Sequence, residues 1–172
     1  MAVARTTSKQ STSNGQRAEA LDVLSLLHQD HEAVGAMIEE VNDCEPGDRR
    51  LKELSESIAQ ALTVHAKIEE DVFYPALRKR AEESEQLTDV FEAYTEHDVI
   101  KHLIALVESD RTRDEKFKAE LQVLGEAVTH HVKEEESTIF AMARELMSRE
   151  ELVDFGAKMA KKKERLMKDV AA

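Results

Sequence analysis

Residues that shape turns and disulfides are scarce in this chain of 172 residues, which contains five glycines, two prolines, one cysteine and no tryptophan. Sandwiches and barrels of many short strands need frequent turn residues, so this shortage excludes an all-β fold of that kind. The single cysteine, Cys44, excludes an intrachain disulfide and leaves no cluster of thiolates for a metal. Residues 1–20 contain no apolar run resembling a signal peptide, so the cytoplasm is the expected compartment.

Basic residues are also in the minority, with 24 lysines and arginines against 36 aspartates and glutamates and a formal net charge of −12. A surface of this sign repels nucleic-acid phosphates and anionic lipids, so neither nucleic acid nor a membrane is an expected partner. A content of 41% hydrophobic and 35% charged residues is typical of a soluble globular protein, and the length suits one domain with a sizeable core.

Apolar residues recur at spacings of three and four in four long segments, which predicts four amphipathic helices at about 20–44, 49–82, 86–110 and 114–147. The polar breaks are short, so we expect an all-α, up-down-up-down four-helix bundle over residues 20–147. Residues 148–172 open with a capping-box pattern at Ser148–Glu151 and predict an additional C-terminal capping helix. The polar residues 1–19 are predicted to be a flexible, disordered tail.

An internal repeat distinguishes four of the seven histidines. When the chain is shifted by 66 residues against itself, two histidines and two glutamates of the first half fall on identical residues of the second half. The matched pairs are His31 and His97, His65 and His131, Glu69 and Glu135, and Glu70 and Glu136. The other three histidines fall opposite other residue types. The first pair of predicted helices is therefore repeated by the second pair.

The four repeated histidines also lie on the apolar stripes of their helices, near the middle of each, so they are expected to point inward in one layer. Glu69 and Glu135 continue two of these stripes one turn further. Buried carboxylates need a cation, and no lysine or arginine points inward at this level, so the sequence predicts a metal. Two histidines and one carboxylate with open positions form a ligand set of non-haem iron, whereas structural zinc usually has four ligands, often including cysteine.

Four short motifs carry a resemblance to a known family. They are Asp30-His31, the segment from His65 through Glu69-Glu70 to Tyr74-Pro75, Glu96-His97, and the segment from His131 to Glu135-Glu136. With these motifs, residues 24–145 resemble the hemerythrin-like family of HHE cation-binding domains. The resemblance implies a four-helix bundle around a non-haem di-iron centre, in a family whose members are implicated in oxygen binding, in responses to nitric oxide or peroxide, and in iron sensing.

Carried over residue by residue, the resemblance implies histidines as terminal ligands and two glutamates as bridges between two iron ions, which also share an oxo or hydroxo bridge. The implied ligands are His31, His65, Glu69, His97, His131 and Glu135. Oxygen-carrying hemerythrins, which this chain resembles, take a further histidine from the third helix, where this chain has Lys101. That difference argues against reversible oxygen carriage.

Further side chains are candidates to support these ligands. His28 and Tyr94 each lie three residues before a proposed ligand and would contact the metal layer as partners or extra ligands, or else only pack between helices. Glu70 and Glu136 either orient histidines or are solvated charges. The lysines at 161–163 are interpreted as a solvated helix face, with a docking patch as the alternative. The aromatic residues assigned to the core are Phe73, Tyr74, Phe91 and Phe140.

Three functions fit this pattern. The first is a di-iron protein that binds, senses or detoxifies a small oxidant or diatomic molecule (O2, H2O2 or NO) at an open iron position. The second is an enzyme with peroxide-consuming or oxidase-type activity at the same centre. The third is a helical interaction module, metal-free or stabilised by metal, or an iron-handling protein, and a homodimer is compatible with each.

Overall fold

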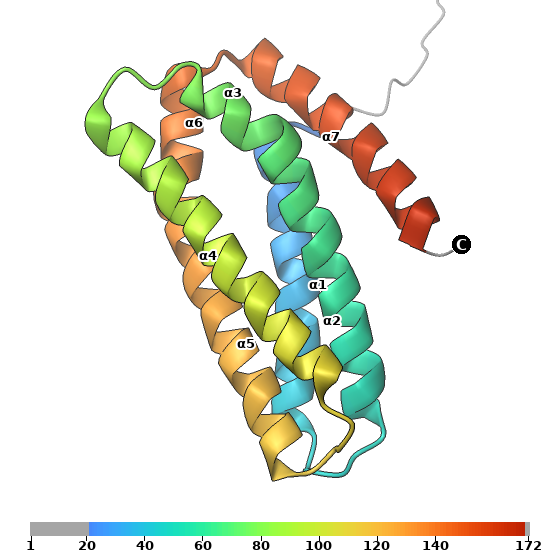
Figure 1. The fold of residues 1–172 in the computed structure, drawn as a ribbon. Coiled ribbons are helices and arrows are strands. Elements are labelled where there is room, and N and C mark those ends of the chain that lie inside the picture. Colours follow the sequence, from blue (N-terminus) through green and yellow to red (C-terminus); the bar gives the residue numbers. More distant parts are fainter. Residues whose placement is uncertain (1–20, 171–172) are drawn as a thin grey trace, which may run out of the picture.

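The computed structural model describes residues 21–170, which form a bundle of four antiparallel helical rods with a fifth helix on one side (Figure 1). The predicted tail at 1–19 lies outside the described residues. The first rod is α1 (Val23–Asp43), the second comprises α2 (Arg50–Ile68), η1 (Glu69–Phe73) and α3 (Tyr74–Arg78), and the third is α4 (Ser84–Ser109). The fourth comprises α5 (Glu115–Glu134), η2 (Glu135–Ile139) and α6 (Phe140–Leu146), and α7 (Arg149–Val170) is the fifth helix.

The all-α bundle predicted from the sequence is confirmed, and residues 21–170 contain no β-strand. Polar residues cap the start of two of the helices. The Asp22 carboxylate accepts the backbone N–H of Ser25 at 2.9 Å. Ser148 and Glu151 form the predicted capping box, in which the Ser148 N–H donates to the Glu151 carboxylate at 2.9 Å. No helix in the part of the chain that the structure describes is long and apolar enough to cross a membrane.

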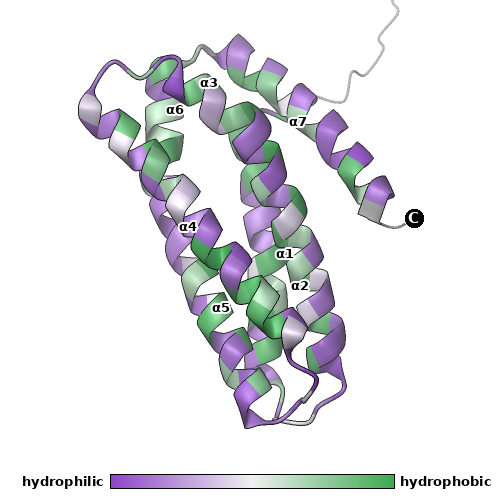
Figure 2. Cartoon of the chain, viewed as in Figure 1, coloured by the Kyte–Doolittle hydropathy of each residue, from purple (hydrophilic) through white to green (hydrophobic). Residues whose placement is uncertain are grey.

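A buried polar layer divides the core into two apolar clusters. The first cluster lies where α1 begins and includes Leu27 together with side chains of η1, α3, α6 and α7. The second lies toward the other end and includes Val34 and side chains of α2, α4 and α5. Along α1, His31 falls between these two residues and marks the level of the polar layer. Hydrophobic and hydrophilic residues share each long helix (Figure 2), as amphipathic segments of a bundle require.

Two π-helical turns interrupt the second and fourth rods at positions that the repeat makes equivalent. η1 begins at Glu69 and η2 at Glu135. Each turn is one residue longer than an α-helical turn, so the N–H of Tyr74 bonds to the Glu69 carbonyl and the N–H of Phe140 to the Glu135 carbonyl. Pro75 lies in the first turn of α3, and η2 contains no proline, so proline is not the common cause of the two turns.

Helix α7 packs closely across the start of α1. Met159 of α7 is fully buried in the first apolar cluster. A Cβ atom at Gly156 would lie 2.8 Å from the backbone carbonyl carbon of Asp22, so only glycine permits this approach. The predicted C-terminal helix is therefore fixed to the bundle by its own close contact.

The lysine run at 161–163 is divided between the bundle and solvent. Lys162 pairs with Asp71 of η1 at 2.5 Å, and Lys163 pairs with Asp30 of α1. Lys161 is exposed. The interpretation of this run as a solvated helix face therefore holds for Lys161 and not for Lys162 and Lys163, which contact acidic residues of the bundle.

Three of the four aromatic residues assigned to the core are buried, namely Phe73, Tyr74 and Phe140. Phe91 is 49% exposed instead, and the guanidinium carbon of Arg78 lies 4.7 Å from the centre of its ring. A cation over the ring face accounts for an aromatic residue on the surface.

Candidate metal centre

The six residues implied as ligands come together in the buried polar layer, although they lie on different elements. His31 lies on α1, His65 near the end of α2, His97 on α4 and His131 on α5. All six are buried, with at most 7% of any residue exposed. Two groups with ligand atoms within 4.8 Å of one another form in the described residues: His31, His65, Glu69 and Glu135, and Glu69, His97 and His131.

The histidines form two pairs, one from each half of the repeat. Nε2 of His31 lies 3.2 Å from Nε2 of His65, and Nε2 of His97 lies 3.1 Å from Nε2 of His131. The ring planes of each pair are inclined at 61°. Each pair thus directs two ring nitrogens toward one common point.

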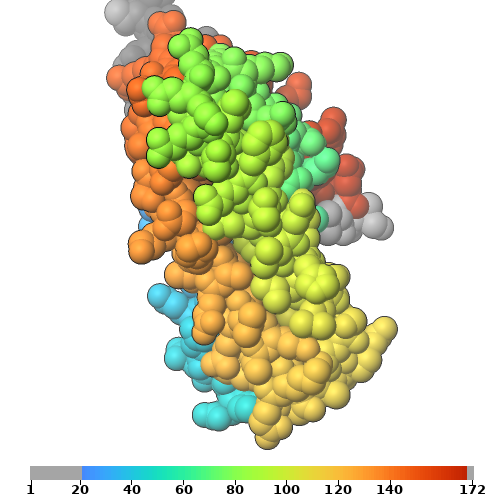
Figure 3. Space-filling view, turned by 60° about the vertical axis from the view of Figure 1, so that its left-hand side comes forward, coloured from blue at the N-terminus to red at the C-terminus, as the bar shows by residue number. Residues whose placement is uncertain are grey.

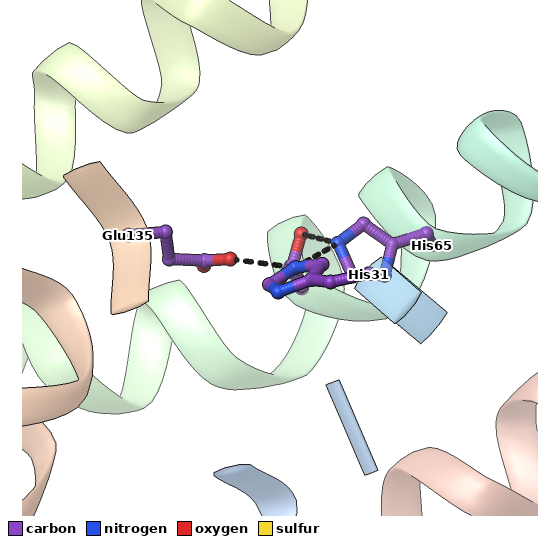
Figure 4. Close-up of side chains that lie close together, drawn as sticks. His31, His65 and Glu135 are labelled. Atoms are coloured by element: carbon purple, nitrogen blue, oxygen red, sulfur yellow. Dashed lines mark hydrogen bonds and ion pairs between the residues drawn. The ribbon is translucent and has the colours of Figure 1, made fainter. Parts of the chain in front are cut away.

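The two glutamates lie between the pairs. Oε2 of Glu69 is 3.1 Å from Nε2 of His65 and 3.3 Å from Nε2 of His97. Figure 4 shows Glu135 extending across the bundle toward His31, with its Oε2 atom 3.2 Å from Nε2. The same oxygen lies 4.0 Å from Nε2 of His131. Each carboxylate therefore approaches one histidine of each half, the position that a carboxylate bridging two cations needs.

A carboxylate also lies beside the Nδ1 atom of each of these histidines. Glu136 and Glu70 lie 2.8 Å and 3.0 Å from Nδ1 of His31 and His97. Glu96 lies 2.8 Å from Nδ1 of His131, and Asp30 lies 3.5 Å from Nδ1 of His65. The hydrogen-bonded carboxylates at His31, His97 and His131 hold the proton on Nδ1 and leave the Nε2 lone pair directed at the centre, as in metal-ligating histidines. The Asp30 carboxylate lies near Nδ1 of His65 without a hydrogen bond between the two atoms.

Of the two roles expected for Glu70 and Glu136, the structure agrees with the orientation of histidines, because both lie against ring nitrogens. No role was expected for Asp30 and Glu96. Both precede a repeated histidine directly and are matched by the same offset of 66 residues, so the repeat contained the signal that could have found them.

His28 and Tyr94 remain outside the ligand layer. His28 is half exposed, and its Nδ1 atom lies 2.8 Å from Glu136, so it contacts the centre only through that carboxylate. The Tyr94 hydroxyl donates to the backbone carbonyl of Glu70 at 3.4 Å, and its ring packs edge-on against Tyr74 with centroids 5.1 Å apart. The structure therefore gives neither residue the position of an additional ligand.

Tyr74, a predicted core residue, also contacts the ligand layer. Its hydroxyl donates to Oε1 of Glu135 at 2.9 Å and lies 3.4 Å from Nε2 of His97. The equivalent residue of the second half is Phe140, whose ring stacks on His31 with centroids 6.0 Å apart. The two halves of the centre therefore differ in one hydroxyl group, a difference visible in the repeat as tyrosine opposite phenylalanine.

The electrostatics of this layer favour a cation. Both carboxylate oxygens of Glu69 and the Oε2 atom of Glu135 are buried without a hydrogen-bond partner. Within residues 21–170, neither glutamate pairs with a lysine or arginine. Burial alone would lower the pKa of His65, but the Glu69 carboxylate outweighs it and raises the pKa to about 10. Burial alone would raise the pKa of Glu69, but the charges of His65 and His97 hold it well below its usual range.

Protons or metal ions must therefore occupy this layer, because facing lone pairs and bare carboxylates repel one another. The donor set consists of imidazole nitrogens and carboxylate oxygens without thiolate, since the only cysteine, Cys44, lies at the C-terminal end of α1. Such a set suits a first-row transition metal. The residues present thus fit a pair of metal ions.

Comparison with known proteins gives a family and a fold. The family model of the hemerythrin HHE cation binding domain matches residues 22–143. A curated relative from Nostoc sp., described as a DNA nickase, is 28% identical over 156 residues, which cover 88% of this chain and 43% of the relative. This chain thus spans less than half of that relative. The crystal structure of a hemerythrin HHE cation binding domain-containing protein from Mycobacterium kansasii superposes with a TM-score of 0.73 at 20% identity, covering 85% of this chain and 87% of the other.

Proposed function

Because the chain belongs to the family of hemerythrin HHE cation-binding domains, we propose that its buried centre binds two non-haem iron ions and meets a small oxidant or diatomic molecule at an open iron position. The observation that carries this proposal is the arrangement of two histidine pairs around glutamate oxygens that accept no hydrogen bond. His31 and His65 would hold one ion, His97 and His131 the other, and Glu69 and Glu135 would be shared.

The bound iron would supply the redox chemistry, and the protein's own residues would set its surroundings. Glu136, Glu70 and Glu96 hold the imidazoles of His31, His97 and His131 in the tautomer that presents Nε2, and Asp30 lies 3.5 Å from Nδ1 of His65. The Tyr74 hydroxyl keeps a proton beside Glu135. The apolar clusters above and below exclude bulk water from the layer.

We further propose a role with O2, H2O2 or NO rather than with DNA. The relative described as a DNA nickase is longer than this chain, and the activity in its description belongs to that protein. The net charge of −12 opposes binding of a phosphate backbone. Of the three consecutive lysines, Lys162 and Lys163 are paired with Asp71 and Asp30 and are not free for phosphates. A gel-shift assay with duplex and nicked DNA checks this at low salt, and binding below micromolar concentration would contradict it.

The direct test is metal analysis and absorption spectroscopy of protein purified from iron-replete cells. We expect two irons per chain and an oxo-to-iron absorption band that shifts when azide is added. His65→Ala should lose both, whereas His102→Ala should retain both, because His102 is an exposed residue of α4 outside the centre. Protein with less than about one iron per chain and no azide-sensitive band would refute the proposal.

Consumption of peroxide is the second candidate function, and the Tyr74 hydroxyl beside Glu135 favours it as a buried proton donor. Oxygen evolution from H2O2 should then be lost in His65→Ala and retained in His102→Ala. Equal rates in both variants would exclude catalysis at this centre.

A metal-free scaffold is the alternative, and it makes a different thermal prediction. A metal that binds only the folded state raises the melting temperature by mass action, so chelation should lower Tm. An unchanged Tm after complete removal of metal would support the scaffold.

A further inference from the structure

An acidic opening lies beside the centre, on the side of the bundle formed by α4, α5 and η2. Its cavity of about 70 Å³ is lined by Asp89, Glu92, Glu96, Glu134, Glu135 and Thr138, among others. Figure 3 shows this side of the molecule, where α4 (yellow-green) and α5 (orange) lie next to each other without another helix over them.

Glu135, a proposed metal ligand, lies at the inner end of the opening. Glu135 is 1% exposed, and its Oε2 atom accepts no hydrogen bond. Glu134 next to it is exposed, as is Glu92 on α4. The lining of the opening therefore extends from exposed carboxylates to Glu135, whose Oε2 atom faces His31 in the buried layer.

The other half of the repeat lacks most of these polar lining residues. An offset of 66 residues relates four of the polar lining residues to apolar ones. The pairs are Asp89 and Val23, Glu92 and Leu26, Glu134 and Ile68, and Thr138 and Val72. The first three of these apolar residues belong to the buried cluster that also contains Leu152 and Met159 of α7, and Val72 packs against it. The same positions are thus apolar where α7 covers the bundle and polar where no described helix does.

Three of the carboxylates that line the opening also lack cationic partners. No ion pair with a lysine, arginine or histidine among residues 21–170 involves Asp89, Glu92 or Glu134. Burial and the nearby Glu85 carboxylate raise the pKa of Asp89. Glu96 differs from the other three, because it binds His131 and His130 and so orients a ligand. A dication would relieve the repulsion among the unpaired carboxylates.

We propose that this acidic opening is the port through which a divalent cation reaches the buried centre. The proposal rests on the metal-binding function proposed above. Asp89, Glu92 and Glu134 attract the hydrated cation, and Glu135 accepts it at the inner end. Clefts lined by charge of one sign raise the association rate of the opposite charge by about 10- to 1,000-fold. At the equivalent positions of the other half, apolar side chains under α7 stand in place of these carboxylates.

The test is the rate at which metal-free protein takes up ferrous ion under anaerobic conditions. Samples are quenched with a chelator at successive times and counted for bound iron. The triple variant Asp89→Asn, Glu92→Gln, Glu134→Gln should load at least about tenfold more slowly at low salt, with the same final iron content as wild type. Added salt should slow the wild type and leave the variant nearly unchanged, because the steering is electrostatic.

A matched control changes the same charges elsewhere. Glu39→Gln, Glu40→Gln, Asp43→Asn removes two glutamates and one aspartate from exposed positions at the far end of α1. This variant should load within about twofold of the wild-type rate, because its charges lie at the other end of the bundle and do not line the opening. Circular dichroism and thermal melts check that both triple variants fold.

The outcomes separate the port from the centre. If wild type takes up iron and both triple variants load equally fast, the port is refuted while the centre stands. If the opening variant loses final iron content, its carboxylates hold the ion rather than guide it, and the port is again refuted. If wild type takes up no iron, the proposed function fails and the port fails with it. Should the triple variant not fold, Glu92→Lys alone should load more slowly than Glu92→Gln, and equal rates would refute the port.

Discussion

Lys163 of α7 forms an ion pair with Oδ1 of Asp30, and Oδ2 of the same carboxylate lies 3.5 Å from Nδ1 of His65. Burial alone would raise the pKa of Asp30, but the contacts with His65 and Lys163 lower it. A helix beyond the matched family residues 22–143 therefore takes part in positioning a proposed ligand.

We predict that Lys163→Met weakens metal binding about tenfold, because loss of a residue that orients a metal ligand typically costs 10- to 100-fold in affinity. Competition with a chelator of known affinity measures the change. Lys161→Met removes the same charge from an exposed position of the same helix and should leave affinity unchanged. Lys163→Arg keeps a positive charge at this position and should retain most of the wild-type affinity. Equal affinities for Lys163→Met and Lys161→Met would contradict the role of the ion pair.

Removal of the Tyr74 hydroxyl should destabilise the metal-free protein. Tyr74→Phe leaves Oε1 of Glu135 without its donor at 2.9 Å, and an unsatisfied buried group costs about 1–3 kcal/mol. Urea denaturation of wild type and variant gives this difference. Tyr94→Phe is the control, since its hydroxyl only reaches a backbone carbonyl at 3.4 Å near the surface. A variant of Tyr74 as stable as that of Tyr94 would show that the contact contributes nothing.

Two glycine substitutions should have opposite effects. Gly156→Ala places a methyl group 2.8 Å from the Asp22 carbonyl carbon, so α7 must shift, at a cost of about 1–3 kcal/mol. Gly35→Ala adds a methyl group with no atom within 4 Å in the interior of α1, and should stabilise the helix by up to about 1 kcal/mol. Thermal unfolding of both variants tests the pair, and a Gly156→Ala variant as stable as Gly35→Ala would refute the close packing of α7.

The ion pair between Glu151 and Arg80 should make the stability of the protein depend on pH. The hydrogen bond from Arg80, with those from Ser148, lowers the pKa of Glu151 to about 2 from its ordinary value of 4.5. A lowered folded-state pKa means that the contribution to stability is complete above about pH 4.5 and disappears as pH falls through about 2. Arg80→Ala should raise this pKa toward 4.5, as measured by carbon NMR of the side-chain carboxyl. Lys79→Ala, the neighbouring charge change, should leave the pKa of Glu151 in place.

Much of the centre could be predicted because helical periodicity and the repeat act along the chain. The spacing of four residues between His65 and Glu69 places both on one helix face whatever surrounds them. Because the repeat matches them with His65 and Glu69, the same spacing is predicted to place His131 and Glu135 on one helix face. Short loops determine antiparallel neighbours, so the expected bundle and the helix ranges agree with the structure to within a few residues.

Contacts between helices could not be predicted in this way. Glu136 of η2 binds His31 of α1, and Glu70 of η1 binds His97 of α4, so each pairing joins the two halves of the repeat. Such contacts depend on the rotation and height of each rod in the bundle. Tyr74 follows the π-helical turn of the second rod, and its hydroxyl donates to Glu135 on the fourth rod. No spacing within one segment encodes that contact.

The sequence by itself determined the class of fold, the six residues of the polar layer and the direction in which they point, because each follows from periodicity within a helix and from a repeat. The tertiary structure decided which carboxylate holds which imidazole, where Tyr74 donates its proton, and that α7 seals one half while acidic residues line the other. These features arise from packing between distant segments, whose relative placement is set by the whole core rather than by any local pattern.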